Sequence, residues 1–348
     1  MTHMTSHPSC ISRRQLLRGA AGAVAAGALL AALPANAAGG LVALVHTQAA
    51  GDAGPVDSMI AKLNQFAQEH DMRARAIYAE DPSTYETIFT SLGEAGAAIV
   101  VSTFNEVAEP FKAVAPKFPD TKFIQLFADP FEPTMPNVMT VSYDYYLGCY
   151  LSGIFAARVS RSGKLGFIGG ISIPPINADY NAFKAGALSV NPDLKVSVAF
   201  AGSFQDPAKG QEIATQMFSD GIDYIQTDAA ATDFGIIAAA GENEGRVVST
   251  LDPAQFPLDP TSVISIVGLD FGTSLYNEAT KALDAGWAGG HEATGLGTGV
   301  IDFIPSPLFA EKGPEEIRKL AEEALPAVNE ARSKILDGSL TVPFDTNL

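Results

Sequence analysis

The chain has 348 residues, of which 47% are hydrophobic, 32 are Gly and 22 are Pro. A chain with this composition can bury a sizeable core, which excludes an intrinsically disordered protein. Its length indicates about two domains. The 39 acidic residues outnumber the 22 basic residues, which gives a formal net charge of −17. Because so acidic a protein repels the phosphates of nucleic acids and of anionic membrane surfaces, we expect no nucleic-acid partner.

The chain contains only two cysteines, Cys10 and Cys149, and five histidines. Two cysteines are too few for a disulfide framework or a Cys-based zinc site. Three of the histidines (His3, His7 and His46) lie near the N-terminus, which leaves few candidate ligands for a metal elsewhere. Cys149 lies in an apolar helical stretch, where we expect a packed, inert thiol. We therefore expect no metal and no cofactor.

The first 37 residues have the pattern of an export signal. Ser12-Arg13-Arg14-Gln15-Leu16-Leu17 precedes an uncharged run at residues 20–33, and Ala35-Asn36-Ala37 matches the small-x-small site of signal peptidase. The paired arginines predict twin-arginine export. A transmembrane anchor is the alternative, but a run rich in Ala and Gly is shorter than the roughly 20 strongly apolar residues that span a bilayer. We expect a mature, free protein in the periplasm or another extracytoplasmic space, with a charge of −20 after removal of three arginines.

From residue 41 onward, short apolar or β-branched runs alternate with amphipathic helical stretches. This alternation predicts parallel sheets covered by helices on both faces. The expected strands are residues 41–46, 73–79, 97–102 and 122–127 in a first series, and residues 164–169, 195–200, 224–227 and 247–250 in a second series, with a short strand at residues 138–141 between the two series. Most of the runs are too solidly apolar for sheets with one exposed face, which is typical of parallel strands buried on both faces.

Two successive series of similar length predict two doubly wound parallel-sheet α/β lobes. We expect the first lobe to contain residues 38–141 together with about 268–305, and the second lobe to contain residues 142–267. The segments at 141–144 and 267–270 are the candidate hinge crossings. Residues 306–348 are expected to form a helical tail that packs on the lobes. Its charged helix, which we expect Pro326 to interrupt, is either a clasp across the lobes or an ordinary surface helix.

In open parallel sheets, small molecules bind beyond the carboxyl ends of the strands, so the residues that follow the strands are the candidate ligand contacts. The candidates of the first lobe and the return crossing are Asp57, Phe104, Asn105, Asp129 and Asp270, and those of the second lobe are Phe204, Asp206, Asp228 and Asp252. These residues are aromatic and acidic, with almost no base nearby. Carboxylates accept hydrogen bonds and aromatic rings stack on flat faces, so the set favours a neutral or cationic polar solute over a phosphate or carboxylate.

Each candidate also has a purely structural interpretation. Asp206 precedes Pro207 and can serve as a helix cap. Asp129 and Asp252 also precede prolines and can begin turns. Phe104 and Phe204 can be core side chains. The prediction of a binding site therefore depends on the shared position of these residues at the ends of strands.

The sequence contains no recognisable catalytic motif. The glycines of Gly166-Phe167-Ile168-Gly169-Gly170 do not have the spacing of a dinucleotide-binding loop, and there is no Walker-type loop or Gly-x-Ser-x-Gly elbow. His291-Glu292 lacks the second histidine of a His-Glu-x-x-His metal site. We therefore expect a binding protein and not an enzyme, although an exported hydrolase with paired acids is a minor alternative.

Several stretches resemble the basic membrane protein (BMP, PnrA-like) family of ABC-transporter substrate-binding proteins. The resemblance rests on residues 163–170, on Phe183-Lys184-Ala185-Gly186-Ala187 with Val190-Asn191-Pro192-Asp193, on residues 202–210 (Gly-Ser-Phe-Gln-Asp-Pro-Ala-Lys-Gly), and on residues 116–123. Together with the charged C-terminal helix, it covers nearly all of the mature chain. It implies the two-lobed fold of type I periplasmic binding proteins and a purine nucleobase or nucleoside as the ligand.

The resemblance also implies roles for individual residues. Members of the family hold a purine between aromatic rings from the two lobes, and hold its ribose with an acid and a lysine. Phe204 matches a stacking position, and Asp252 matches the ribose-binding acid. The family's Phe-Asn pair is replaced near Pro55-Val56-Asp57, so the second ring would come from Phe104 or Phe131. The sugar-binding lysine is missing, because residues 267–271 hold Asp270 in its place.

The resulting hypothesis is a solute-binding protein whose lobes close about a hinge on a small solute, which is then delivered to an ABC permease. Such a protein would act as a monomer and would not insert into the membrane. The alternative is a receptor that presents a different, non-purine ligand to a sensor kinase or a chemoreceptor. The sequence does not distinguish transport from sensing, whereas neighbouring genes would.

Overall fold

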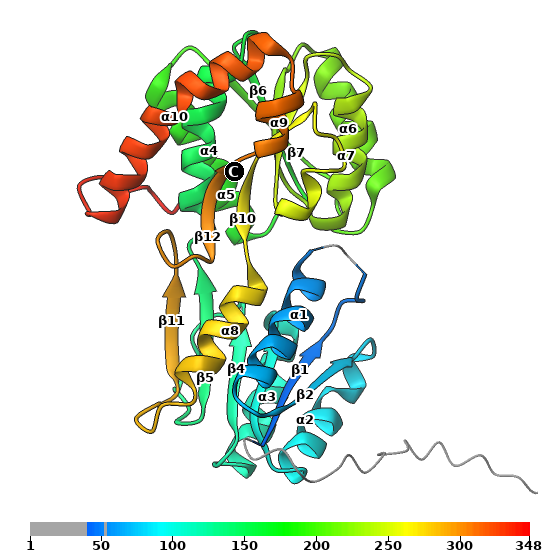
Figure 1. Cartoon of the computed structure of the whole chain (residues 1–348), viewed down its shortest axis with the longest axis vertical. Coiled ribbons are helices and arrows are strands. Elements are labelled where there is room, and N and C mark those ends of the chain that lie inside the picture. Colours follow the sequence, from blue (N-terminus) through cyan, green and yellow to red (C-terminus); the bar gives the residue numbers. More distant parts are fainter. Residues whose placement is uncertain (1–39, 52–53) are drawn as a thin grey trace, which may run out of the picture. The chain divides into compact units, whose positions relative to one another are not determined.

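The computed structural model describes residues 40–51 and 54–348, so the predicted export signal lies outside the described residues. The described chain forms two six-stranded sheets (Figure 1). The strands of the first sheet, in their order across it, are β11 (Gly290–Thr294), β5 (Val138–Tyr143), β4 (Lys122–Leu126), β3 (Ala97–Thr103), β1 (Leu41–His46) and β2 (Arg73–Tyr78). Those of the second are β12 (Ile301–Pro305), β10 (Val263–Leu269), β9 (Val247–Thr250), β8 (Tyr224–Asp228), β6 (Lys164–Gly169) and β7 (Lys195–Phe200).

Strand pairing is parallel throughout the first sheet, and β12 is the antiparallel edge strand of the second. Central strands such as β1 are buried along their whole length, because helices cover both faces of the sheet. The prediction of two doubly wound parallel α/β lobes is therefore confirmed. We call each sheet with its helices a lobe.

Four helices cover the first sheet. They are α1 (Pro55–Glu69), α2 (Tyr85–Glu94), α3 (Ala108–Val114) and α8 (Phe271–Lys281). Helices α1 and α8 pack on one face of the sheet, where Leu63 and Leu275 are fully buried. Helices α2 and α3 pack on the other face, where the rings of Phe89 and Phe111 meet edge to face with centroids 4.6 Å apart.

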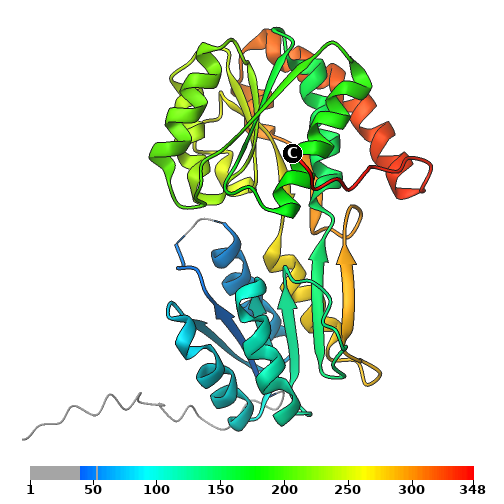
Figure 2. The ribbon, with the colours of Figure 1, turned by 180° about the vertical axis from the view of Figure 1, so that it is seen from behind.

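The second lobe has the same layered arrangement, seen from behind in Figure 2. Its helices are α4 (Tyr145–Val159), α5 (Pro174–Val190), α6 (Pro207–Ser219), α7 (Asp233–Gly241), α9 (Pro307–Lys312) and α10 (Glu315–Leu336). Helices α4 and α5 pack on one face, with α10 against them, and α6 and α7 pack on the other. Helix α4 is apolar nearly all round because α5, α10 and the sheet surround it.

The chain passes between the lobes three times. The crossings are Asp144 between β5 and α4, Asp270 between β10 and α8, and residues 295–300 between β11 and β12. Neighbouring crossings are joined by backbone hydrogen bonds of 2.8 Å, one from Asp144 N to Thr294 O and one from Asp270 N to Val300 O. The two candidate hinge segments thus lie at observed crossings, and the loop after β11 adds a third.

Two expectations about the C-terminal part of the chain are wrong. Strand β12 belongs to the second sheet, although we placed residues up to about 305 in the first lobe. The chain reverses after β11, and β12 pairs with the otherwise open edge of β10. Pro326 also does not interrupt the charged helix, since α10 continues through it. Burial of Ala324 and Val328 against α4 offsets the roughly 3 kcal/mol that an interior proline costs.

Helix α10 covers the second lobe. Its Arg332 donates to the Asp302 carboxylate and to the Phe303 carbonyl oxygen, both on β12, at 2.9 and 2.7 Å. Within residues 40–51 and 54–348, no helix has the length and apolar character needed to cross a bilayer.

Helices α4 and α5 approach each other at glycines, and this contact generates a stability prediction. A Cβ atom at Gly153 would lie 2.0 Å from the carbonyl oxygen of Phe183, and one at Gly186 would lie 2.1 Å from that of Tyr150. Gly153→Ala should therefore lower the free energy of unfolding by about 1–3 kcal/mol, because the helices must separate. Urea denaturation measures the change. Gly286→Ala is the matched control, since its Cβ would meet nothing within 4 Å. Equal stability of the two variants would contradict the prediction.

Candidate functional site

Strand order fixes one preferred binding position in each lobe. In the first sheet the chain goes from β1 to β2 on one side and then to β3 on the other, and in the second it goes from β6 to β7 and then to β8. Ligands of doubly wound sheets bind where the strand order reverses, beyond the carboxyl ends of the two strands that flank this point. The flanking residues are His46 and Phe104 in the first lobe, and Gly170 and Asp228 in the second.

Phe104 follows β3 at the reversal point of the first lobe. Its φ of 68° lies in the left-handed region, which costs a non-glycine residue on the order of 1–3 kcal/mol. Two hydrogen bonds hold this conformation, from Phe104 N to Leu126 O at 2.9 Å and from Gln125 Nε2 to Phe104 O at 2.6 Å. Phe127, after the adjacent strand, also has a positive φ of 52°. Two strained aromatic residues thus lie side by side at the ends of adjacent strands.

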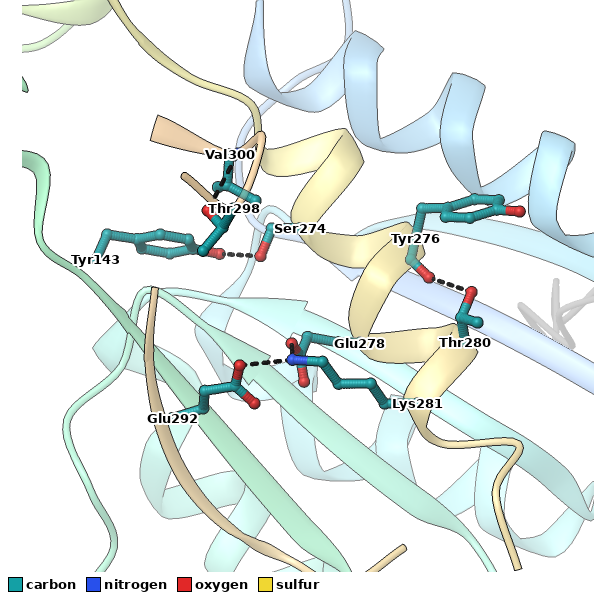
Figure 3. Close-up of polar contacts among 9 residues, drawn as sticks. All are labelled: Tyr143, Ser274, Tyr276, Glu278, Thr280, Lys281, Glu292, Thr298 and Val300. Atoms are coloured by element: carbon teal, nitrogen blue, oxygen red, sulfur yellow. Dashed lines mark hydrogen bonds and ion pairs between the residues drawn. The ribbon is translucent and has the colours of Figure 1, made fainter. Parts of the chain in front are cut away.

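Four aromatic rings form a cluster at this end of the first lobe. The ring of Phe104 lies 5.6 Å from that of Phe127 and 6.0 Å from that of Phe271, and the ring of Tyr143 lies 5.9 Å from Phe127 and 5.3 Å from Phe271. The Tyr143 hydroxyl makes a 2.7 Å hydrogen bond with Ser274 Oγ on α8 (Figure 3). Tyr143 and Phe271 each adjoin a crossing, so the cluster connects Phe104 to two of the three crossings.

Sequence reasoning did not identify Phe127 and Tyr143 as site residues, and it named Phe271 only as the neighbour of Asp270 at the return crossing. Phe127 was assigned to the end of a strand, and Phe271 to the start of a helix, next to the candidate Asp270. Their common signal was present, because each is an aromatic residue at the carboxyl end of a strand or at a crossing. What the sequence could not provide is their convergence, which depends on the order of the strands.

The crossing region of the first lobe is also held by an ion-pair network. Lys281 on α8 pairs with Glu278 at 2.8 Å and with Glu292 on β11 at 2.5 Å (Figure 3). Glu278 is buried, and its burial raises the pKa of its carboxyl group. The network ties α8 to β11, the strand that precedes the third crossing.

Phe204 lies at the reversal point of the second lobe, in the loop after β7. A Cβ atom at Gly170 would lie 2.2 Å from Phe204 Cδ1, so the ring packs directly on the Gly170 backbone. Gly170 donates its N–H to the carbonyl oxygen of Asp228 at 2.8 Å, and its own carbonyl oxygen accepts from Gly202 N at 2.7 Å. Phe204 is half-buried. Only glycine at position 170 leaves room for the ring, and the Gly170 backbone is in turn hydrogen-bonded to Asp228.

Asp228 is 9% exposed and ends β8 beside Gly170. Its side chain lies close enough to that of Asp179 on α5, which is 4% exposed, to share a hydrogen bond with it, and its Oδ2 has no hydrogen-bond partner among the described residues. Burial raises the pKa of both carboxyl groups, that of Asp228 to about 6. Asp179 was not predicted as a site residue, because it lies within a helix and not after a strand.

Three other candidates, Asp57, Asp252 and Asp270, line a pocket of about 420 Å³ to which both lobes contribute. Asp57 accepts from Gly51 N at 2.8 Å, and Asp252 accepts from Ala254 N at 2.7 Å as the cap of a short helical turn. Asp270 caps α8, accepting from Thr273 N at 2.9 Å and Thr273 Oγ1 at 2.6 Å, and it also accepts from Ser58 Oγ at 3.0 Å. Each of the three carboxylates thus has a structural hydrogen bond.

The remaining candidates are exposed. Asn105 and Asp129 contact each other, with Asn105 Nδ2 donating to Asp129 Oδ2 at 3.3 Å. Asp206 caps α6 by accepting from Lys209 N at 3.0 Å. Phe131, our alternative source of a stacking ring, is buried among the helices of the first lobe and lies in its core. Phe104 is therefore the better placed of the two rings.

Asp233 is another buried acid of the second lobe, on the opposite face of the sheet from Asp179. It is fully buried at the start of α7, and its Oδ2 accepts from Thr227 Oγ1 at 2.8 Å while Oδ1 has no partner. Burial raises the pKa of its carboxyl group well above the ordinary value of 3.8.

No group of side chains in the described part of the chain has the composition of a metal site.

Comparison with known proteins gives consistent results. Residues 41–343 match the family model of ABC transporter substrate-binding protein PnrA-like. The chain is 30% identical over 269 residues to basic membrane protein A2 of Borrelia garinii subsp. bavariensis, with 76% of each chain covered. It is 29% identical to a purine-binding protein of Brucella abortus, over 67% of this chain and 63% of the relative. A solute-binding protein of an ABC transporter from Aeropyrum pernix K1 has the same fold, with a TM-score of 0.74 at 20% identity over 88% of this chain and 94% of the other.

The buried acid Asp233 generates a prediction about stability and pH. Because its pKa is raised in the folded state, its protonated form stabilises the fold fully below about pH 4, and that contribution is lost as the pH rises through the higher folded-state pKa. Asp233→Asn mimics the protonated form. The stability of Asp233→Asn relative to the original protein should therefore increase with rising pH.

Urea denaturation of both proteins over a pH series measures the difference. Asp120→Asn, at an exposed turn, is the matched control for the loss of one acidic residue. A stability difference for Asp233→Asn that does not depend on pH would show that the carboxyl group ionises as easily in the folded protein as in the unfolded chain.

Proposed function

Because the chain belongs to the PnrA-like family of ABC transporter substrate-binding proteins, we propose that it captures a purine nucleobase or a nucleoside-like solute and delivers it to a membrane permease. The family consists of extracytoplasmic binding proteins and not of enzymes. We also propose that residues 1–37 direct twin-arginine export and that the protein acts as a monomer, since delivery requires the rims of both lobes to be accessible. The name of the Brucella abortus relative supports a purine ligand.

The observation that carries this proposal is the presence of one aromatic ring at the reversal point of each lobe. Phe104 follows β3 and has a strained, positive φ, and the ring of Phe204 packs on the backbone of Gly170. A flat heteroaromatic solute can stack on both rings when the lobes close. Asp228 would accept a hydrogen bond from the edge of the solute. In the family, one ring from each lobe holds the purine. Phe204 matches one of these positions, and Phe104 would replace the ring that is missing near Asp57.

Lobe closure about the three crossings would couple binding to a change of conformation. A ligand shifts the equilibrium between open and closed forms only if it binds one form better, and a ligand between Phe104 and Phe204 touches both lobes only in the closed form. Single residues or short loops form the crossings, and such segments can absorb a rotation of one lobe against the other.

The position of Asp270 favours a free nucleobase over a nucleoside. The family's ribose-binding lysine would lie near this crossing, where Asp270 stands instead with both of its carboxylate oxygens engaged at the start of α8. Asp252, the matching ribose acid, caps its own turn. Neither residue is arranged here as part of an acid–lysine pair for a sugar.

Replacing the stacking ring tests the site. Phe204→Ala should weaken the binding of the preferred purine by about 1–3 kcal/mol, or roughly tenfold to 100-fold, because one stacking face is lost. Phe204→Leu should recover little of the loss, since it restores volume and not a flat ring. Isothermal titration calorimetry with adenine, hypoxanthine, guanine and their nucleosides measures both variants.

The matched control is Phe344→Ala, which removes a ring that is 61% exposed on the C-terminal tail. Its affinity should equal that of the original protein. Unchanged binding of all six compounds by Phe204→Ala would disprove the site. After incubation of the original protein with the six compounds, chromatography should show the compounds intact. The appearance of a cleavage product would disprove a pure binding function.

Lobe closure gives a second test. Small-angle X-ray scattering should show a smaller radius of gyration with a saturating purine than without it, because closure brings the lobes together. Phe104→Ala should need a higher purine concentration for the same compaction. If calorimetry shows binding and the radius does not change, the proposed hinge closure is wrong.

A further inference from the structure

Two buried carboxyl groups, Asp179 on α5 and Asp228 at the end of β8, lie close enough to share a hydrogen bond. Their exposed fractions are 4% and 9%. A carboxylate has no hydrogen to donate, so a hydrogen bond between two carboxyl groups requires one of them to be protonated. The pair therefore carries one shared proton and, in that state, a single negative charge.

Among the described residues, no basic side chain acts on the pair and could replace this proton with its own positive charge. The titratable groups near it are Tyr145 and Cys149 on α4 and Asp233 on α7, and none of them is basic. Burial raises the pKa values of the Tyr145 hydroxyl and the Cys149 thiol, which keeps both groups neutral. None of the ion pairs formed by the described residues includes Asp179 or Asp228.

The two members of the pair differ in their position relative to the proposed ligand. Asp228 adjoins Gly170, on whose backbone the ring of Phe204 lies, and its buried Oδ2 has no partner. A buried acceptor without a partner costs about 1–3 kcal/mol, so the fold retains an acceptor here at the expense of stability. Asp179 lies behind it on α5, where its neighbours Asn177 and Asn181 hold the C-terminal tail through the carbonyl oxygens of Thr346 and Asp345.

We propose that Asp179 is a positioning residue that holds the shared proton and thereby presents Asp228 as a charged hydrogen-bond acceptor to an N–H group of the ligand. This inference rests on the proposed function, because it assigns Asp228 to the edge of a purine whose face lies on Phe204. It deepens that function by predicting the feature that the second lobe recognises. A flat solute without an N–H donor at its edge would bind weakly, since it would bury the Asp228 carboxylate without a partner.

The arrangement predicts a specific dependence of binding on pH. A second proton on the pair neutralises Asp228 and removes the charged acceptor. Because the pKa of Asp228 is raised to about 6, affinity should be constant above pH 6 and should fall below it, by up to tenfold per pH unit. A role of Asp179 in packing alone would not produce this profile.

Two variants separate positioning from packing. Asp179→Asn keeps a donor to Asp228, so hypoxanthine and adenine should bind at neutral pH as they do to the original protein. Asp179→Leu removes the donor, so the affinity for purines should fall by about tenfold. The fall in affinity at acid pH should also begin at a higher pH than in the original protein. Calorimetry on both sides of pH 6 measures these effects, and circular dichroism checks that both variants fold. If both variants bind with the affinity and pH profile of the original protein, the proposal is wrong.

Infrared spectroscopy of the ligand-free protein tests the shared proton independently of any ligand. At neutral pH the original protein should show, in addition to any band from Asp233, the C=O band of one further protonated, buried carboxyl group that Asp179→Asn lacks. If that band persists unchanged in Asp179→Asn, the shared proton is disproved. If the band disappears but neither purine binds the original protein, the proposed function fails and the assignment of Asp228 to a purine fails with it, while the shared proton stands.

Discussion

Parallel strand pairing is the constraint on which the rest of this structure depends. It brings the carboxyl ends of neighbouring strands to one edge of each sheet, so loops far apart in the sequence meet there. It also requires helices on both faces, which accounts for the apolar strands and for the close α4–α5 contact at Gly153 and Gly186. On each edge, the point where the strand order reverses is the preferred position for a ligand. Phe104 occupies that position in the first lobe, and Asp228 with Phe204 occupies it in the second.

The two lobes present different chemistry at these positions. The first lobe offers an aromatic cluster that includes strained residues and adjoins two crossings, so a ligand on Phe104 would contact residues next to the crossings about which we propose that the lobes close. The second lobe offers one ring and a buried acceptor. Both features carry a conformational or electrostatic cost in the free protein, and a solute that donates an N–H to Asp228 would relieve the electrostatic cost.

The fold was predictable because alternating strand and helix patterns, and solidly apolar strands, are local properties of the sequence. The resemblance to the PnrA-like family is likewise confirmed by the match over residues 41–343. The predictions failed where contacts between residues far apart in the sequence determine the structure. Residues 301–305 join the second sheet because β10 has a free edge, and Pro326 stays helical because α4 supports the helix. At the site, the positions of Phe104 and Phe204 follow from strand ends, whereas Asp179 could not be found, because only tertiary packing brings a mid-helix acid to Asp228.

The central claim is that a planar solute lies between the rings of Phe104 and Phe204 with its edge on Asp228. A crystal structure of the protein with its tightest-binding purine tests it most directly. We expect the purine to be stacked between the two rings, with an N–H group within hydrogen-bonding distance of Asp228. A purine bound elsewhere, or bound between the lobes with both rings turned away from it, would contradict the account.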